Sequence, residues 1–98
     1  MNEQPVDGRL CTAKHQLVVQ TYVVQEHSGV YHYEIILAPD AGPDSPRTML
    51  RTRDEAAYDF ALAIEGNPAA RVTATFHHAK RGSYRYRVLD SIVMGAAA

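Results

Sequence analysis

The chain has 98 residues, of which 46% are hydrophobic and 21% are charged, and its formal net charge is −1. This length suits one domain with a core of its own, and the composition excludes a disordered chain. The single cysteine, Cys11, excludes an internal disulfide, and the net charge is poor for a protein dedicated to nucleic acid.

The first residues of the chain show no hydrophobic period. Residues 1–14 hold Pro5 and Gly8 among mixed polar side chains, and we expect them to form a loose arm. The opening letters, MNEQPVDGRLC, contain no apolar segment of the kind found in secretory signals. No run in the chain approaches the roughly 20 apolar residues of a membrane span. We therefore expect a cytoplasmic protein that does not associate with membranes.

Two β-rich runs follow, separated by a short turn at residues 27–29. Residues 15–26, HQLVVQTYVVQE, are rich in Val, Thr and Tyr, which indicates a long strand. Its apolar residues occur at both parities, so the strand is covered on both sides or coils like the first strand of a small barrel. Residues 30–38 form the partner strand. We expect its uncharged face to be buried: Tyr31, Tyr33, Ile35 and Leu37.

A proline-rich loop at residues 39–46, PDAGPDSP, leads to a short third strand at residues 47–52. Alternation along this strand directs Leu50 inward. The outward positions are Arg47, Met49, Arg51 and Arg53.

A helix is predicted over residues 53–65. Thr52 and Glu55 are spaced as in a capping box, and Gly66 marks the end of the helix. The apolar side chains that recur with helical spacing, and that we expect to be buried, are Ala56, Ala57, Phe60, Ala61 and Ile64.

The last quarter of the chain is both β-rich and basic. Residues 71–78 and 84–93 alternate apolar and polar side chains around a Lys-Arg-Gly-Ser connection, which predicts a β-hairpin. Residues 70–98 hold five Lys or Arg against one Asp, whereas residues 1–69 hold five against ten Asp or Glu. Such asymmetry creates a local field, although charges on strand edges also serve solubility alone.

The order strand, strand, strand, helix, strand, strand resembles the OB-fold, a five-stranded barrel. The resemblance is at the level of the fold, because no family-specific motif accompanies it. It implies one OB-like domain over residues 15–94, with residues 95–98 as a tail. The alternative is an open antiparallel α+β sheet with one helix packed on it.

Motifs for catalysis and metal binding are missing from the sequence. His77 and His78 are adjacent, so on a strand they point to opposite faces and cannot jointly chelate a metal. There is no HExxH, paired CxxC, GxSxG elbow or glycine-rich phosphate loop. We therefore predict a protein without catalytic activity, cofactor or metal.

The OB-fold resemblance also implies where a partner binds. In that fold the face of strands two and three binds oligonucleotides, flanked by the loops that join strands one to two and four to five. Guanidinium groups bind phosphate and aromatic rings stack on bases. The candidate partner-binding residues are His32, Arg47, Arg51, Arg53, His77, Lys80, Arg81, Tyr84, Arg85 and Arg87.

Two functions fit these observations. The first is a small adaptor, accessory or inhibitory protein that binds a larger protein or self-associates. The second is the binding of single-stranded nucleic acid through the basic third strand and the connection between strands four and five. The net charge of −1 places the protein-binding function ahead.

Overall fold

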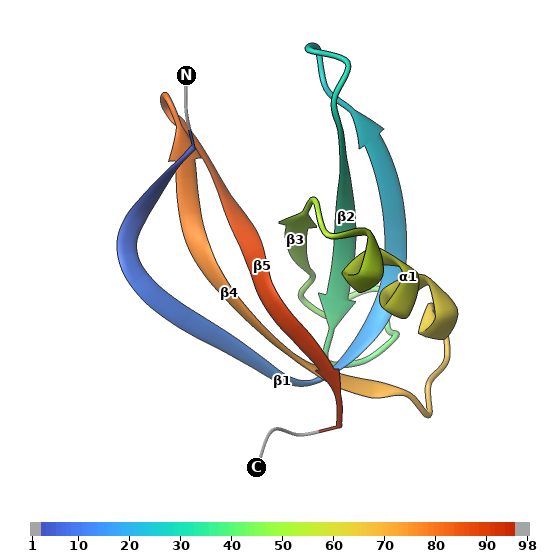
Figure 1. Ribbon diagram of the computed structural model, residues 1–98. Coiled ribbons are helices and arrows are strands. Elements are labelled where there is room, and N and C mark those ends of the chain that lie inside the picture. The colour runs from blue at the N-terminus through green and yellow to red at the C-terminus, as the bar shows by residue number, and fades with distance from the viewer. Residues whose placement is uncertain (1–2, 96–98) are drawn as a thin grey trace.

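Five strands close into a barrel, with one helix packed against it, in a computed structural model that describes residues 3–95 (Figure 1). Of the predicted tail at residues 95–98, only Gly95 belongs to the described part. The elements are β1 (Gln4–Gln25), β2 (Tyr31–Ala38), β3 (Thr48–Thr52), α1 (Glu55–Ile64), β4 (Arg71–Arg81) and β5 (Tyr84–Met94).

Around the barrel the strands follow the order β1-β2-β3-β5-β4, and β4 pairs with β1 to complete the ring. The pairing is antiparallel except between β3 and β5, which run parallel. This closed ring confirms the OB-like barrel, and the alternative of an open sheet is wrong.

The first strand begins much earlier than the sequence suggested. Gln4 pairs with Lys80 and Ala13 with Ala74, so the prediction of a loose arm over residues 1–14 is wrong for the part that the structure describes. Proline and glycine made this segment look irregular. The edge of β4 supplies the hydrogen-bond partners that hold it as a strand.

β1 serves two neighbours. Its first half pairs with β4 and its second half with β2, and Leu17 lies at the change-over, opposite both Ala38 and Arg71. Gly8 and His15 have positive φ angles of 69° and 57°, and each lies at a break in the ladder with β4, where irregular pairing allows the strand to bend. These bends lie at or before the start of the strand predicted over residues 15–26, in the segment expected to be a loose arm.

The barrel interior is filled by apolar side chains from all five strands and the helix. Ile35, Leu37 and Leu50 are fully buried, which confirms the inward faces predicted for β2 and β3. Burying a side chain of this size stabilises the fold by about 1.5–3 kcal/mol. Tyr31 is 55% exposed, so the expectation that it is buried is wrong. The rest of the buried cluster is Val18, Ala61, Val72, Ala74, Phe76 and Leu89.

The helix is shorter than predicted and has a different N-cap. Asp54 is the N-cap, and its carboxylate accepts a hydrogen bond from the Ala56 amide at 3.0 Å. Thr52 lies within β3, where its hydroxyl accepts from the Asp54 amide, so the predicted capping box is wrong. Gly66, with φ of 74°, follows the helix and donates to the Val18 carbonyl at 2.9 Å. Within residues 3–95 no helix is long and apolar enough to span a bilayer.

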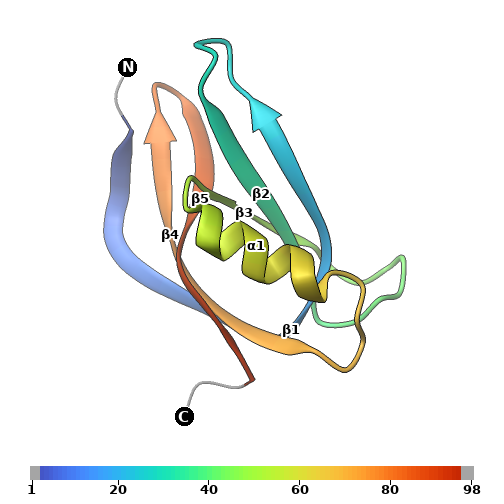
Figure 2. The same cartoon turned by 45° about the vertical axis from the view of Figure 1, so that its right-hand side comes forward.

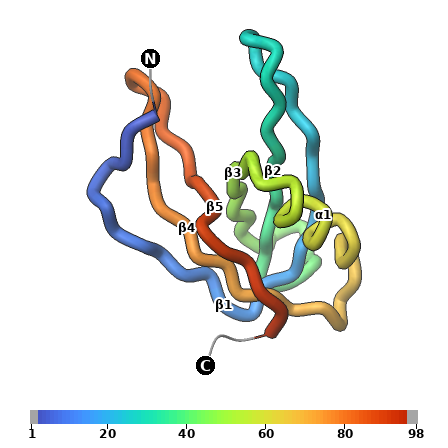
Figure 3. Tube along the Cα trace, viewed as in Figure 1, coloured from blue at the N-terminus to red at the C-terminus, as the bar shows by residue number. Residues whose placement is uncertain are grey.

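Two hairpins extend beyond the barrel at the same end. We call them the β1–β2 arm (residues 22–34) and the β4–β5 arm (residues 78–87). They rise on either side of the short strand β3, and the start of β1 lies beside the β4–β5 arm (Figures 1, 2 and 3). Between the arms, the barrel is closed by few strand contacts, because a single parallel pair, Arg51 and Val88, joins β3 to β5.

Candidate nucleic-acid interface

Two tyrosines and an arginine stack where β3 meets β5. The Arg51 guanidinium carbon lies 4.4 Å from the centre of the Tyr86 ring and 5.6 Å from that of Tyr84. The two rings are stacked with centres 5.6 Å apart. An arginine over an aromatic face is attracted by the ring quadrupole. The fold thus brings Arg51 and Tyr84, predicted separately, into one group.

The two tyrosines of this stack differ in exposure. Tyr86 is buried and donates a hydrogen bond to Glu3 Oε2 at 2.6 Å. Burial, followed by this bond to Glu3, raises the pKa of Tyr86 above its ordinary value. Tyr84 is 55% exposed, at the start of β5. Tyr84 is therefore the accessible ring of the stack; it packs against Tyr86, and its hydroxyl accepts a hydrogen bond from Arg51 Nη2 at 3.5 Å.

Glu26 lies at the centre of a second group, which links the two arms. Its carboxylate accepts hydrogen bonds from Arg53 Nη2 at 3.0 Å and from Arg81 Nη1 at 3.3 Å, and lies 3.0 Å from His32 Nδ1. We call these four residues the Glu26 cluster. The bond from His32, followed by contacts from Arg81 and Arg53, holds the pKa of Glu26 below its usual value against the opposing effect of burial.

His32 is not available at the surface. It is 3% exposed, with Nε2 lying 3.2 Å from Glu34 Oε2 on the side away from Glu26. Both contacts are hydrogen bonds only when the ring carries two protons, since a neutral imidazole donates once. The expectation that His32 lies on the outward face is wrong, because the carboxylates of Glu26 and Glu34 cover it.

The same carboxylates restrict three of the predicted arginines. Glu26 holds Arg53 and Arg81, and Glu34 lies 3.9 Å from Arg51. We expected these guanidinium groups to project freely to solvent, and for these three that expectation is wrong. Within residues 3–95, the buried side-chain polar atoms that lack a hydrogen-bond partner are Nε of Arg51 and Nε of Arg81. An unsatisfied buried donor costs about 1–3 kcal/mol.

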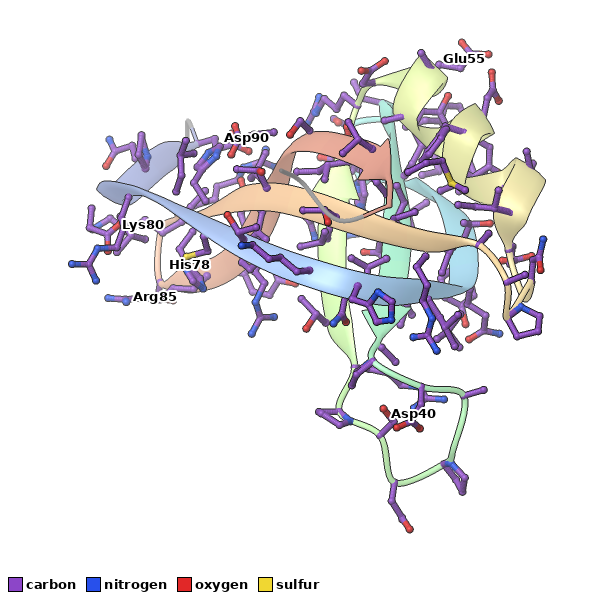
Figure 4. All side chains as sticks on the ribbon, turned by 90° about the horizontal axis from the view of Figure 1, so that it is seen from below. Asp40, Glu55, His78, Lys80, Arg85 and Asp90 are labelled. Carbon is purple, nitrogen blue, oxygen red and sulfur yellow. The ribbon has the colours of Figure 1, made fainter. Side chains whose placement is uncertain are left out.

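Three other cations of the β4–β5 arm are free. Lys80 lies opposite Arg85 and His78 opposite Arg87, so these side chains share the face of the arm that points away from Tyr84. The side chains of Lys80, Arg85 and Arg87, here called the arm cations, make no hydrogen bond or ion pair with any residue in 3–95. Figure 4 shows Lys80, His78 and Arg85 together at one end of the molecule, far from Asp40 and Glu55.

The two remaining predicted residues lie apart from both groups. Arg47 donates to the carbonyls of Gly42 and Ser45, at 3.3 and 2.9 Å, and thereby holds the proline-rich loop. His77 Nδ1 lies 2.8 Å from Asp90 Oδ2, so its ring already has a hydrogen-bond partner. The structure therefore separates the ten predicted positions into a stack, a carboxylate-bound cluster, a free cationic face and these two.

The candidate residues chosen from the sequence did not include Glu26, Glu34 or Tyr86. Glu26 is the last residue of the predicted first strand. Its place beside the predicted turn between the first two strands was the one signal that it could lie near the binding surface. Nothing in the spacing indicated that it would meet Arg81, which lies 55 positions away. Within residues 3–95, no group of three or more His, Cys, Asp and Glu is placed to hold a metal ion.

No protein-family model matches the chain, and no curated protein matches it. Among solved structures that do match is the mitochondrial single-stranded DNA-binding protein Rim1 of S. cerevisiae. The superposition covers 95% of this chain and 99% of that chain, with a TM-score of 0.66 and 12% sequence identity. At this identity the likeness shows a shared fold, and it agrees with the OB-like barrel described above.

Proposed function

We propose that this protein binds single-stranded nucleic acid through the β4–β5 arm and the adjoining surface of β3. The observation that carries the proposal is the combination on one arm of three unpaired cations with an exposed tyrosine. Lys80, Arg85 and Arg87 contact phosphates, and Tyr84 stacks on a base. The protein acts by binding, without catalysis.

The preference for a single strand has a physical reason. The two ring faces of a base are available for stacking only when the strand is unpaired. Tyr84 lies at the tip of a narrow hairpin, so a flexible strand can pass from its ring to the cations on the opposite face. The similar fold of the yeast mitochondrial single-stranded DNA-binding protein supports this choice.

A protein-binding function is favoured by a different surface. The β1–β2 arm exposes the apolar residues Tyr22, Val23, Val30 and Tyr31. Exposed apolar groups of this kind suit a protein partner or a second copy of the chain. Net charge was the only sequence feature that favoured protein binding over nucleic-acid binding. The arm cations lie together with unpaired side chains, and this arrangement favours nucleic acid.

The test is a titration of a fluorescent oligothymidine of about 15 nucleotides, a length that suits one OB-like domain. With three phosphate contacts, the affinity should fall roughly 20-fold between about 50 and about 200 mM salt, since each contact contributes about −0.7 to the logarithmic salt slope. A duplex of the same length should bind more weakly. Absence of binding at the lower salt, together with a discrete oligomer in light scattering, would support the protein-binding function instead.

A further inference from the structure

The Glu26 cluster is built as an anion site. Two guanidinium groups and an imidazole, from Arg53, Arg81 and His32, converge on one carboxylate at 3.0–3.3 Å. These donors come from three places in the fold: the residue after β3, the end of β4, and β2. The guanidinium fork accepts a carboxylate or a phosphate with the same geometry. At present the anion in this site is a side chain of the protein itself.

Three guanidinium groups and three carboxylates lie around this site. Arg51, Arg53 and Arg81 contribute three positive charges, against the carboxylates of Glu26 and Glu34 and that of Glu3, whose charge acts on Arg81. If Glu26 withdraws, three guanidinium groups face two carboxylates. The site then has the charge to bind an external anion.

Glu26 can leave without disturbing the backbone. Glu26 is the first residue of the turn between β1 and β2. Main-chain hydrogen bonds from Glu26 N to Val30 O and from Gly29 N to Glu26 O hold this turn, and they do not involve the carboxylate. The side chains of Arg53 and Arg81 are 52% and 35% exposed, so an anion reaches them from solvent. The buried Nε of Arg81 has no hydrogen-bond partner while Glu26 binds the guanidinium group. Rotation of the Glu26 side chain allows this guanidinium group to turn toward another acceptor.

We propose that the Glu26 cluster is a phosphate subsite, in which a backbone phosphate of the bound single strand replaces the Glu26 carboxylate. This inference rests on the proposed function and extends it from the β4–β5 arm to the end of β3 and the β1–β2 arm. Glu26 acts as a competitor that weakens binding. A strand that displaces it contacts both arms.

The test compares Glu26→Gln with the wild-type protein in the oligothymidine titration. The amide keeps the size of the side chain and removes its charge. We expect binding about fivefold tighter at about 0.1 M salt and a logarithmic salt slope steeper by about 0.7, as for one added phosphate contact. Glu55→Gln, the same change on the helix surface, is the matched control, and its affinity should stay within about twofold because salt screens distant charges.

A second variant separates the subsite from a general charge effect. Adding Arg53→Gln to Glu26→Gln should abolish the gain in affinity and in salt slope. A gain that survives loss of Arg53, or that Glu55→Gln reproduces, would overturn the subsite. So would an affinity for Glu26→Gln equal to or weaker than that of the wild type, in a variant whose melting transition shows it to be folded.

Nuclear magnetic resonance of the wild-type protein tests directly whether the two arginines contact the strand. In ¹⁵N-labelled wild-type protein, the Nε–H resonances of Arg53 and Arg81 should shift on saturation with the oligothymidine. If the oligothymidine binds and these signals do not move, the subsite is wrong while the proposed function stands. If the wild-type protein and Glu26→Gln both fail to bind at low salt, the proposed function and the subsite fail together.

Discussion

Two sets of cations flank the surface between the arms and differ in one respect. Arg53 and Arg81 are bound by Glu26, whereas Lys80, Arg85 and Arg87 have no partner in residues 3–95. In the sequence, every member of both sets counts equally as one positive charge. The difference arises because a carboxylate from a distant part of the chain reaches one set only. Counting basic residues therefore overestimates the charge that is available to a ligand.

The two arms show the same contrast at a larger scale. The β4–β5 arm carries Lys80, Arg85 and Arg87 on one face and an exposed tyrosine on the other, while the β1–β2 arm contributes Glu26 and Glu34 together with exposed apolar residues. One arm thus offers attraction for phosphate, and the other supplies the carboxylates that oppose it. The balance between them sets how strongly the surface between the arms attracts a nucleic acid.

The largest expected effect comes from removing two free cations. Lys80→Gln with Arg85→Gln should weaken binding of single strands about 25-fold at about 0.1 M salt, since each phosphate contact contributes about −0.7 to the logarithmic slope. The salt slope should become shallower by about 1.4. The control is Lys14→Gln with Arg47→Gln, which removes the same charge elsewhere. An equal loss in both double variants would show that only net charge matters.

The next effect concerns the exposed aromatic ring. Tyr84→Ala should weaken binding about fivefold, because stacking on one base contributes about 1 kcal/mol at the lower end of its range. Tyr84→Phe should bind like the wild type, since the ring remains. Tyr31, on the other arm, is also 55% exposed and provides a matched control. If Tyr31→Ala weakens binding as much as Tyr84→Ala, the strand does not favour the β4–β5 arm.

A smaller effect is expected for a cation that is already paired. Arg53→Gln in the wild-type background should change the affinity by less than about twofold, because its contact with a phosphate replaces its contact with Glu26. Arg85→Gln, a free cation with the same chemistry, should cost about fivefold at about 0.1 M salt. Equal losses in the two single variants, measured in the same titration, would remove the distinction between paired and free cations.

The smallest effect concerns stability and pH. The folded protein lowers the pKa of Glu26, chiefly through the bond from His32, so ionised Glu26 stabilises the fold above its unfolded pKa. That contribution is lost as the pH falls through the folded pKa. Wild-type protein should therefore melt at a higher temperature than Glu26→Gln at neutral pH, and the difference should vanish in acid. A difference that is constant between pH 3 and pH 7, by thermal denaturation, would contradict the assignment.

Much of the barrel was predictable, because its evidence is local. Alternation on residues 71–78 and 84–93 identified the last hairpin, and Leu50 was assigned to the core by parity alone. Gly66 marked the end of the helix correctly. Where two local signals competed, the prediction failed: Thr52 and Asp54 both suit an N-cap, and the continuation of β3 through Thr52 decided between them.

The sequence alone determined the order of the elements, the inward placement of Ile35, Leu37 and Leu50 and the basic character of the last hairpin, because each depends on neighbouring residues. Tertiary structure decided that residues 4–13 form a strand, since their hydrogen bonds come from β4. It also decided which cations are free. Glu26 meets Arg53 and Arg81 across 27 and 55 positions, and an ion pair between distant residues forms only where the closed barrel brings the two charges within bonding distance.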